Sequence, residues 1–236
     1  MNPQYDRSYY ETAYPDGYAF DKIREVVNIG RFSLLLKKTG RKISRILDVG
    51  CGYGYFLKIC DEYGLSTYGI DVSKYALIKA KLNTKAILIQ QSVEDPFPFP
   101  DMFFDVVVAF DFIDHLIHPV KFLQETYRVL KRSGVLIIEC ENSHSLSATI
   151  FTKNWIGYAD KTHVNLFSLK TVKDLLMKAE FTRIRLETRG LPYHPKMRPL
   201  RTSVTRKNFV AITAKMYKMF RLPLGLGDHI FAYCFK

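Results

Sequence analysis

The chain has 236 residues, 47% of them hydrophobic, which suits one α/β domain with a full core and excludes two large domains. It holds no run of about 18 apolar residues, so we expect no membrane-spanning helix. Its first residues lack the apolar core of a signal peptide, and its four cysteines are scattered without a Cys-x-x-Cys pair. We therefore expect reduced structural thiols, no metal site and a cytoplasmic location.

The positive charge is concentrated toward the carboxyl end. The net charge is +12, but residues 1–180 carry 23 lysines and arginines against 21 acids, whereas residues 181–236 carry 12 against 2. Between Arg189 and Arg221 there are nine basic residues and no acid. This local excess, rather than the overall charge, requires an explanation.

The first two thirds of the chain alternate short apolar runs with helical patterns. Residues 1–18 are rich in tyrosine and are expected to form an irregular arm, and a helix over about 19–38 follows. Runs as apolar as 106–109 suit strands that are buried on both faces of a parallel sheet. The pattern predicts strands at 45–49, 66–70, 86–89, 105–110 and 135–140, with helices at about 55–63, 74–82 and 119–131.

The last third departs from this strict alternation. Residues 143–167 lack a clear period, and Ser168 can cap a helix that runs to Glu180. Residues 181–188 alternate like a strand near a sheet edge. A long connection at 189–227, with four prolines, precedes a final strand at about 228–235. Strands that alternate with helices predict a doubly wound α/β fold.

Residues 46–54 contain a buried strand that leads into a Gly-x-Gly-x-Gly turn. A strand, a glycine-rich turn and a helix N-terminus form a cradle of nucleotide size. Gly50 and Gly52 fit the Gly-x-Gly-x-x-Gly pattern of dinucleotide sites, but Tyr55 stands in place of the third glycine. The spacing therefore argues against a generic dinucleotide site.

Two acids flank this turn. Asp48 lies at the mouth of the cradle, where it disfavours an anionic pyrophosphate and favours a cationic ligand. Asp71 ends the next strand, where it can accept hydrogen bonds from both hydroxyls of a ribose. On these residues, and on the segments 104–116 and 130–138 that follow in order, the sequence resembles the small-molecule branch (methyltransferase type 11/23) of the class I S-adenosylmethionine-dependent methyltransferases. The resemblance covers about residues 45–187.

The resemblance implies a Rossmann-like α/β fold with a seven-stranded, mostly parallel sheet whose last strand is antiparallel. It implies S-adenosyl-L-methionine as the cofactor and S-adenosyl-L-homocysteine as its product. Asp48 stands where the family holds the donor's ammonium group. Ser92 stands where the family usually has an acid for the adenine amino group. The expected cofactor-binding residues are Asp48, Gly50, Cys51, Gly52, Gly54, Asp71, Val72, Ser92, Val93, Phe110, Asp111 and Tyr10.

Two histidines are the catalytic candidates. His115 follows the fourth strand and recurs in the small-molecule branch, and a pKa near neutrality suits a general base or a substrate orienter. The alternative is a packing role. His163 lies in the loop after the fifth strand, and this loop can cover the bound acceptor, so His163 is expected to contact the substrate. The alternative is that His163 only forms a hydrogen bond with the backbone of its own loop. Tyr9 and Tyr10 belong to an arm that folds over the donor in this family.

The basic segment leaves three interpretations open. It departs from the carboxyl end of the sixth strand, beside the crevice, which favours an anionic acceptor or an anionic surface. Residues 207–221 place apolar and basic residues on opposite helical faces, a pattern typical of a helix that lies on a membrane. One alternative is an ordinary helix that packs against the domain. The other is that residues 189–221 make non-specific contacts with the phosphates of a nucleic acid. The chain shows no recognised RNA-binding module, and 111–114 lack the Asn/Asp-Pro-Pro-aromatic motif of amino-directed DNA methyltransferases.

We therefore expect one methyltransferase domain over residues 1–236. It divides into an N-terminal arm and helix (1–40), a donor-binding core (41–142), an acceptor loop (143–167) and a C-terminal part (168–236) with a basic insert at 189–227. The expected function is methyl transfer to a small-molecule acceptor, at oxygen before nitrogen or carbon. The alternatives are a nucleic-acid-directed methyltransferase that uses the basic segment, and a non-catalytic module that binds the donor.

Overall fold

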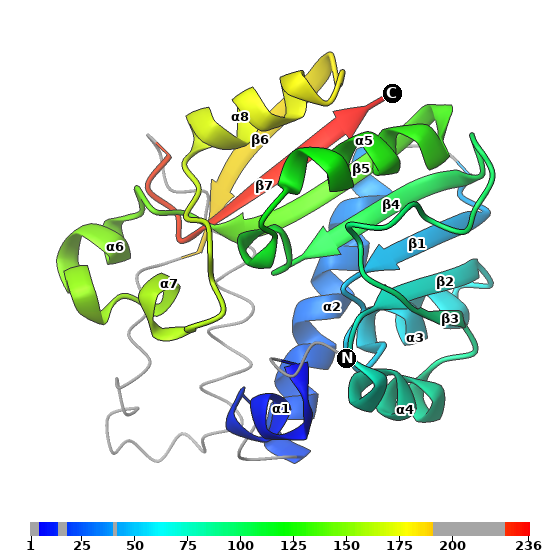
Figure 1. Cartoon of the computed structure of the whole chain (residues 1–236), viewed down its shortest axis with the longest axis horizontal. Coiled ribbons are helices and arrows are strands. Elements are labelled where there is room, and N and C mark those ends of the chain that lie inside the picture. The colour runs from blue at the N-terminus through cyan, green and yellow to red at the C-terminus, as the bar shows by residue number, and fades with distance from the viewer. Residues whose placement is uncertain (1–4, 14–17, 40–41, 191–224) are drawn as a thin grey trace.

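The computed structural model describes residues 5–13, 18–39, 42–190 and 225–236, and its centre is one seven-stranded sheet (Figure 1). The strand order is β3-β2-β1-β4-β5-β7-β6, and β7 runs antiparallel to both of its neighbours while the other pairs are parallel. The expected α/β fold with an antiparallel last strand is thus confirmed. The strands are β1 (Arg45–Val49), β2 (Ser66–Asp71), β3 (Ile87–Gln90), β4 (Phe104–Phe110), β5 (Leu130–Glu141), β6 (Arg183–Arg189) and β7 (His229–Phe235).

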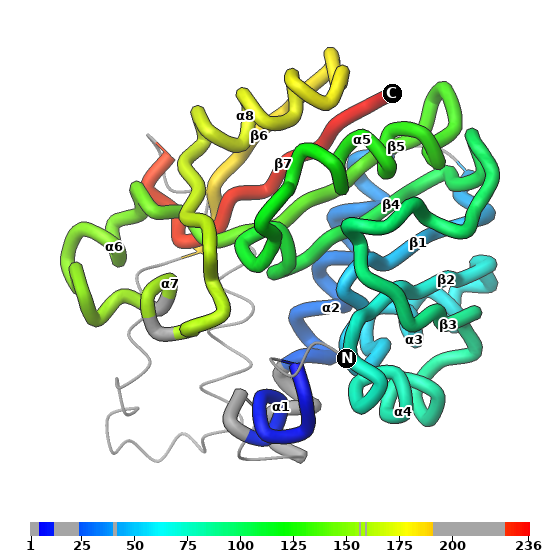
Figure 2. Tube along the Cα trace, viewed as in Figure 1, coloured from blue at the N-terminus to red at the C-terminus, as the bar shows by residue number. Residues whose placement is uncertain are grey.

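Helices cover both faces of the sheet (Figures 1 and 2). One face packs against α2 (Tyr18–Thr39) and α3 (Tyr55–Glu62), and the other against α5 (Pro119–Val129) and α8 (Leu169–Lys178). The helix α4 (Lys74–Asn83) lies beside β3 and α3. Because both faces are covered, every residue of β4 is buried, as its unbroken apolar run predicts.

The two cores follow from strand alternation. Val106 and Val108 of β4 belong to the cluster that contains Phe32 of α2, whereas Val107 belongs to the cluster that contains Phe122 of α5. Successive side chains of a strand point to opposite faces, so one apolar run fills both cores. The strands are thereby held rigidly, which fixes the positions of the residues at their carboxyl ends.

The expectation of an irregular amino-terminal arm is wrong for residues 7–13, which form α1 (Arg7–Ala13). The Asp6 carboxylate accepts hydrogen bonds from the backbone N–H groups of Ser8 and Tyr9, at 2.8 and 3.2 Å. It therefore satisfies donors that the first turn of a helix leaves unpaired. The sequence signal for this helix was Asp6, an aspartate that can cap a helix N-terminus. The tyrosines that follow it have a weak helix propensity, so the helix was not predicted.

The segment 143–167 also holds helices too short to show a period: α6 (Leu146–Phe151), η3 (Thr152–Asn154) and α7 (Ile156–Ala159). The Ser145 hydroxyl caps α6 by accepting from the Ala148 N–H at 3.0 Å, and the fully buried Trp155 anchors the segment. The predicted cap of α8 is present, because the Ser168 hydroxyl accepts from the Thr171 N–H at 3.2 Å.

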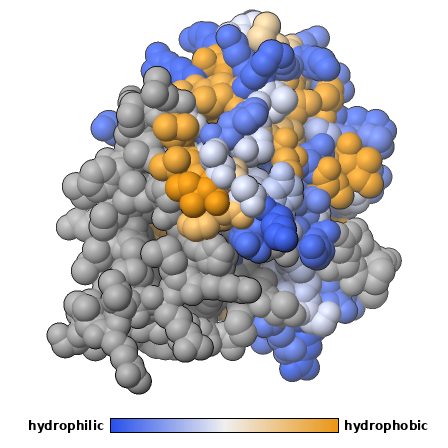
Figure 3. Space-filling view, turned by 90° about the vertical axis from the view of Figure 1, so that its left-hand side faces the viewer, coloured by the Kyte–Doolittle hydropathy of each residue, from blue (hydrophilic) through white to orange (hydrophobic). Residues whose placement is uncertain are grey.

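Most of the basic insert, residues 191–224, lies outside the described residues, and so does the amphipathic helix expected at 207–221. Among the helices that are described, none is both long and apolar enough to cross a membrane. Seen from the side of α6 and α7, the described surface mixes polar and hydrophobic residues, and the hydrophobic ones form separate groups (Figure 3). The division into four segments and the cytoplasmic location stay predictions.

Candidate active site

A cavity of about 650 Å³ opens at the carboxyl ends of β1, β2, β4 and β5. The strand order reverses between β1 and β4, and such a switch point is where open α/β sheets bind ligands. Its walls combine the glycine turn after β1, the ends of β2 and β4, the helices α1 and α2, and the loop before α8.

The glycine turn brings bare backbone to the cavity. Gly50 has φ +75°, and a side-chain carbon there would lie 2.3 Å from the Phe112 ring. Gly52 has φ +51° and open space where a Cβ would stand. Both positions require glycine. At Gly50 a side chain would conflict with the positive φ and with the Phe112 ring, and at Gly52 it would block a ligand from reaching the backbone. Cys51 also lines the cavity, and burial raises the pKa of its thiol well above the ordinary value.

Gly54 is the one predicted cofactor-binding residue that does not line this cavity. It precedes α3, its N–H donates to the Cys51 carbonyl at 2.9 Å, and a Cβ on it would meet the Thr84 side chain at 2.9 Å. The third glycine of the motif therefore serves the turn and the packing of α3 against α4.

Asp71 is held firmly at the end of β2. One carboxylate oxygen accepts the Gly52 N–H and the other accepts the Ser73 N–H, both at 2.8 Å. Burial raises its pKa, and these backbone hydrogen bonds oppose that rise by favouring the ionised form. Each oxygen keeps a further lone pair, so the carboxylate is preorganised to receive a pair of hydroxyl groups.

Asp48 lies on the floor of the same cavity with 4% of its surface exposed. Burial raises its pKa to about 7, Arg31 opposes that rise and Asp71 adds to it. A cationic group bound beside this carboxyl would hold it in the ionised form.

An Asp48→Asn variant is expected to be more stable than the wild type at pH 8, by roughly 2 kcal/mol. The folded pKa lies above the ordinary value of about 4, so the stability that the neutral carboxyl provides is fully present below pH 4 and is lost as the pH rises through 7. The shift corresponds to about 4 kcal/mol, and burying the amide offsets about half of it. Urea unfolding at pH 5 and pH 8 checks this, and an equal gain at both pH values would contradict it.

A buried arginine organises the ends of β4 and β5. Arg31 of α2 pairs with Glu139 at 2.6 Å and with Asp111 at 2.5 Å, and its guanidinium lies 4.6 Å from the centre of the Phe110 ring. Although burial opposes the charge, the two carboxylates raise the pKa of Arg31 further. Asp111 has φ +50°, a strained conformation that is concentrated at functional sites.

The contribution of α2 to the cavity is not among the features predicted from the sequence. Arg24, Asn28 and Arg31 all line it, and the Asn28 side chain accepts a hydrogen bond from Arg31 at 3.3 Å. Spacings of four and three residues place the three side chains on one helical face. Polar residues on one stripe of an otherwise amphipathic helix were the signal.

The side of the cavity expected to receive adenine is formed by Val72, Ser92 and Val93. The Val72 carbonyl accepts from the Gln90 side chain at 3.3 Å, and the Ser92 hydroxyl accepts from the Glu94 N–H at 3.3 Å. These bonds fix the loop after β3 and leave the Val93 side chain buried.

The amino-terminal helix α1 closes the cavity from above the turn. The Tyr10 ring stacks on the Tyr53 ring with centroids 5.1 Å apart and planes 25° apart. The neighbouring Tyr9 donates its hydroxyl to Asp160 at 3.2 Å. One helix thus contacts both the donor turn and the loop after β5.

Both catalytic candidates reach the cavity, with ring centroids 4.7 Å apart. His115 belongs to η2 (Ile113–His115), and its Nδ1 lies 2.8 Å from the Thr162 hydroxyl. Burial first, and then His163, lower the pKa of His115. The His163 Nδ1 lies 2.9 Å from the Gly157 carbonyl, so this ring bonds the loop's own backbone while it lines the cavity. The catalytic role of either residue stays a prediction.

Within the described part of the chain, two groups of side chains have the composition of metal sites: His115, Asp160 and His163, and Asp111, Glu139 and His229. The first group is hydrogen-bonded through Thr162 and Tyr9, and in the second the two carboxylates pair with Arg31. These internal partners account for both arrangements.

The walls of the cavity are rich in acids although the whole chain is basic. Among the residues that the structure describes, six carboxyl residues face it against two arginines, which suits a ligand that carries positive charge. The carboxyl residues are Asp48, Asp71, Glu94, Asp111, Glu141 and Asp160.

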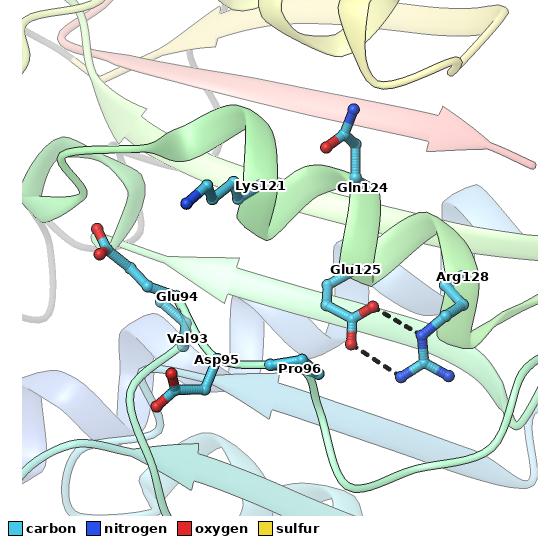
Figure 4. A pocket seen from close by; sticks show the side chains of 8 residues that line it. All are labelled: Val93, Glu94, Asp95, Pro96, Lys121, Gln124, Glu125 and Arg128. Carbon is cyan, nitrogen blue, oxygen red and sulfur yellow. Dashed lines mark hydrogen bonds and ion pairs between the residues drawn. The ribbon is translucent and has the colours of Figure 1, made fainter.

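A second, smaller hollow of about 290 Å³ lies between α5 and the loop after β3 (Figure 4). Two of its polar side chains already bond within the protein, because Arg128 pairs with Glu125 at 2.7 Å and also donates to the Phe97 carbonyl at 3.0 Å. Arg128 therefore fastens the loop to the helix.

The strand order, the antiparallel last strand, the glycine turn and the acids that end β1 and β2 define the class I methyltransferase fold. A family profile described as a methyltransferase domain matches residues 47–138. Among solved structures, a SAM-dependent methyltransferase from Archaeoglobus fulgidus covers 88% of this chain and 93% of its own at a TM-score of 0.63 and 23% identity. A plantazolicin methyltransferase solved with SAH covers 97% and 88% at a TM-score of 0.60 and 18% identity. At these identities the likeness shows the fold alone.

Curated relatives agree with this assignment. An uncharacterized protein of Methanocaldococcus jannaschii is 35% identical over 48% of either chain. A ubiquinone biosynthesis O-methyltransferase of Pelagibacter ubique is 30% identical over 45% of either chain. A malonyl-[acyl-carrier protein] O-methyltransferase of Enterobacter lignolyticus is 25% identical over 72% of this chain and 67% of its own. The chain thus spans about half the length of the first two relatives. Residues 47–138 therefore match the methyltransferase-domain family, and this match and the named relatives support S-adenosyl-L-methionine as the cofactor.

Proposed function

We propose that this protein transfers the methyl group of S-adenosyl-L-methionine to an oxygen atom of a small-molecule acceptor, with His115 as the general base. The observation that carries this proposal is the His115 imidazole on the wall of the same cavity as the glycine turn and Asp71, where burial and then His163 lower its pKa. A hydroxyl acceptor must lose its proton during transfer, and an imidazole is the side chain best suited to take it near neutral pH. The two O-methyltransferases among the relatives support the choice of oxygen.

The open backbone and the acidic side chains of the cavity support donor binding there. The backbone around Gly52 is open, and Asp71 offers two lone pairs for the ribose hydroxyls. Asp48 would face the ammonium group, and Arg24 would face the carboxylate of the same amino-acid end. The sulfonium supplies the methyl group together with its own leaving group, so the protein need not activate the donor.

The remaining task of the chain is to orient the acceptor and to accept its proton. His115 and His163 form adjacent rings on one wall, and the exposed side chains of Ile117 and Val164 lie at the same opening. An acceptor held there would present its hydroxyl to the His115 ring. Precise placement of two reactants provides much of the rate enhancement in such displacements.

The test combines donor binding with turnover. Calorimetry measures the affinity for S-adenosyl-L-methionine, and release of S-adenosyl-L-homocysteine is followed across a panel of phenols, aliphatic alcohols, carboxylic acids and amines. Turnover confined to hydroxyl acceptors supports the proposal. Turnover on RNA alone would favour the nucleic-acid alternative, and donor binding without any turnover would favour a non-catalytic module.

His115→Gln is expected to lower kcat by about 100-fold and to leave donor affinity within about threefold, because loss of a general base costs 10²–10⁴-fold. Turnover and calorimetry on the same preparation check this. His118→Gln is the matched control, because His118 is exposed, lies three residues away and does not line the cavity. An equal loss of donor affinity and kcat in His115→Gln would make His115 structural.

A further inference from the structure

We propose that Thr162 and Asp160 are positioning residues for His115: their hydrogen bonds hold the neutral ring with its proton on Nδ1 and leave Nε2 as the proton acceptor. This catalytic consequence rests on the proposed function, whereas the tautomer itself can be measured without any acceptor.

The tautomer follows from the number of protons available. The Thr162 hydroxyl has one proton, and it donates this proton to the Asp160 carboxylate at 2.6 Å, since an ionised carboxylate can only accept. The 2.8 Å contact between that hydroxyl and the His115 Nδ1 must then be one in which the ring nitrogen donates. A neutral imidazole carries one N–H, so Nε2 bears the lone pair.

Asp160 is itself held by two parts of the chain. Its Oδ1 also accepts the Thr162 N–H at 2.8 Å, and its Oδ2 accepts the Tyr9 hydroxyl of α1 at 3.2 Å. Although burial raises the pKa of Asp160, the bonds from Thr162 together with His163 and His115 outweigh burial and lower it, so the carboxylate is ionised at neutral pH. The network therefore connects η2, the loop before α8 and the amino-terminal helix.

The charges around His115 set the direction of its titration. The His163 ring and the Tyr5 ring lie at 4.7 and 6.0 Å between centroids, and Asp160 and Asp111 are the nearby acids. Burial and His163 lower the pKa of His115, whereas Asp160, the Thr162 backbone and Asp111 raise it. Removing the Asp160 charge should therefore weaken His115 as a base.

The bond between Asp160 and Thr162 also has a purely local explanation, because an aspartate that accepts from the residue two positions later forms an Asx turn. A turn of that kind would fold the loop without any effect on His115. The experiment must therefore report on the His115 ring rather than on the stability of the loop.

The tautomer is measured by long-range ¹H–¹⁵N correlation NMR on the full chain with ¹⁵N-labelled histidine, and the His115 signals are assigned by their loss in His115→Gln. We expect the Nδ1–H tautomer in the wild type and in Thr162→Ser, which keeps the hydroxyl. In Thr162→Val the same ring should shift toward the Nε2–H form. Thr149→Val, which removes an exposed hydroxyl on α6, is the control and should change nothing. An Nε2–H tautomer in the wild type, or an unchanged tautomer in Thr162→Val, overturns the proposal.

Turnover then links the tautomer to catalysis. With a hydroxyl acceptor found by the panel, Thr162→Val is expected to lower kcat about 10-fold to 100-fold, with donor affinity within about twofold and recovery in Thr162→Ser. In Asp160→Asn the acid limb of the pH profile should move to lower pH. If Thr162→Val has the kcat and the pH dependence of the wild type, the positioning role is overturned, whereas the proposed methyl transfer is not affected. The expected tautomer in a protein without turnover instead counts against the proposed function alone.

Discussion

Replacing Arg31 by methionine is expected to lower the free energy of unfolding by about 3–5 kcal/mol. Arg31 and Glu139 form an ion pair in which the two side chains are 10% and 1% exposed, so removing the arginine takes a full positive charge away from a buried carboxylate and leaves His229 beside it at 3.6 Å. Methionine keeps much of the hydrocarbon stem, and the loss therefore reports on the charge more than on the packing. Urea unfolding at pH 7 is the measurement.

Lys170→Met provides the matched control for this substitution. Lys170 pairs with Asp174 four residues along α8, but its side chain is 84% exposed, so its loss should cost less than about 1 kcal/mol. A cost of similar size in both variants would mean that the Arg31 pairs add nothing beyond surface ion pairs.

The stability loss in Arg31→Met is also expected to depend on pH. The Asp111 side chain is 50% exposed, and although desolvation raises its pKa, Arg31 together with His229 and Arg24 lowers this pKa to about 2. A depressed folded pKa gives stability that is present above the unfolded value of about 4 and is lost as the pH falls through 2. The stability deficit of Arg31→Met should therefore shrink between pH 5 and pH 2.5, and a deficit that stays constant over this range would contradict the assignment.

The fold could be predicted because its signals are local. The apolar run of β4 and the glycine at position 50 each act within a few residues, and Asp48 and Asp71 lie in the carboxyl-terminal ends of strands that the sequence predicts. Parallel strands bring their carboxyl ends to one edge, so these acids could be placed before any contact was known. Their roles in binding remain proposals.

The rest of the site depends on contacts between distant segments. Arg31 meets Glu139 across 108 residues and Tyr9 meets Asp160 across 151, and neither pair has a pattern within a window of sequence. The sequence allows Thr162 to be placed as a residue that stabilises its own loop. Its contact with His115 cannot be predicted in this way, because it depends on η2 packing beside that loop. The Asp114 carbonyl of η2 accepts the Val164 N–H at 2.9 Å. Single-sequence reasoning finds residues at strand ends more readily than their partners.

The helix α1 gives the site a way to couple its two halves. Adjacent residues contact the donor turn and the acceptor loop, Tyr10 through Tyr53 and Tyr9 through Asp160. Adjacent side chains of a helix point about 100° apart, so a helix lying across the opening can contact both sides at once.

Asp71→Asn is expected to weaken the binding of S-adenosyl-L-methionine on the order of 100-fold. Asparagine keeps the shape of the side chain but replaces one accepting oxygen by a donating NH₂ group, which faces either the Gly52 N–H or the Ser73 N–H. The charge-assisted bonds to the ribose hydroxyls are lost as well. Hydrogen bonds to charged groups contribute about 1.5–3 kcal/mol each, and about 3 kcal/mol in total is a factor of about 100 in affinity.

Calorimetry at pH 8 measures this loss, and Glu94→Gln is the control because Glu94 is an exposed carboxyl on the wall of the same cavity. The control should change affinity by less than about threefold, since a rim charge contributes little to a bound ligand. Burial raises the pKa of Asp71, so neutralising this carboxyl is not expected to unfold the protein, and urea unfolding of both variants separates binding from stability. Donor affinity within threefold of the wild type in a folded Asp71→Asn variant would remove Asp71 from the ribose site and with it the strongest sequence argument for the donor.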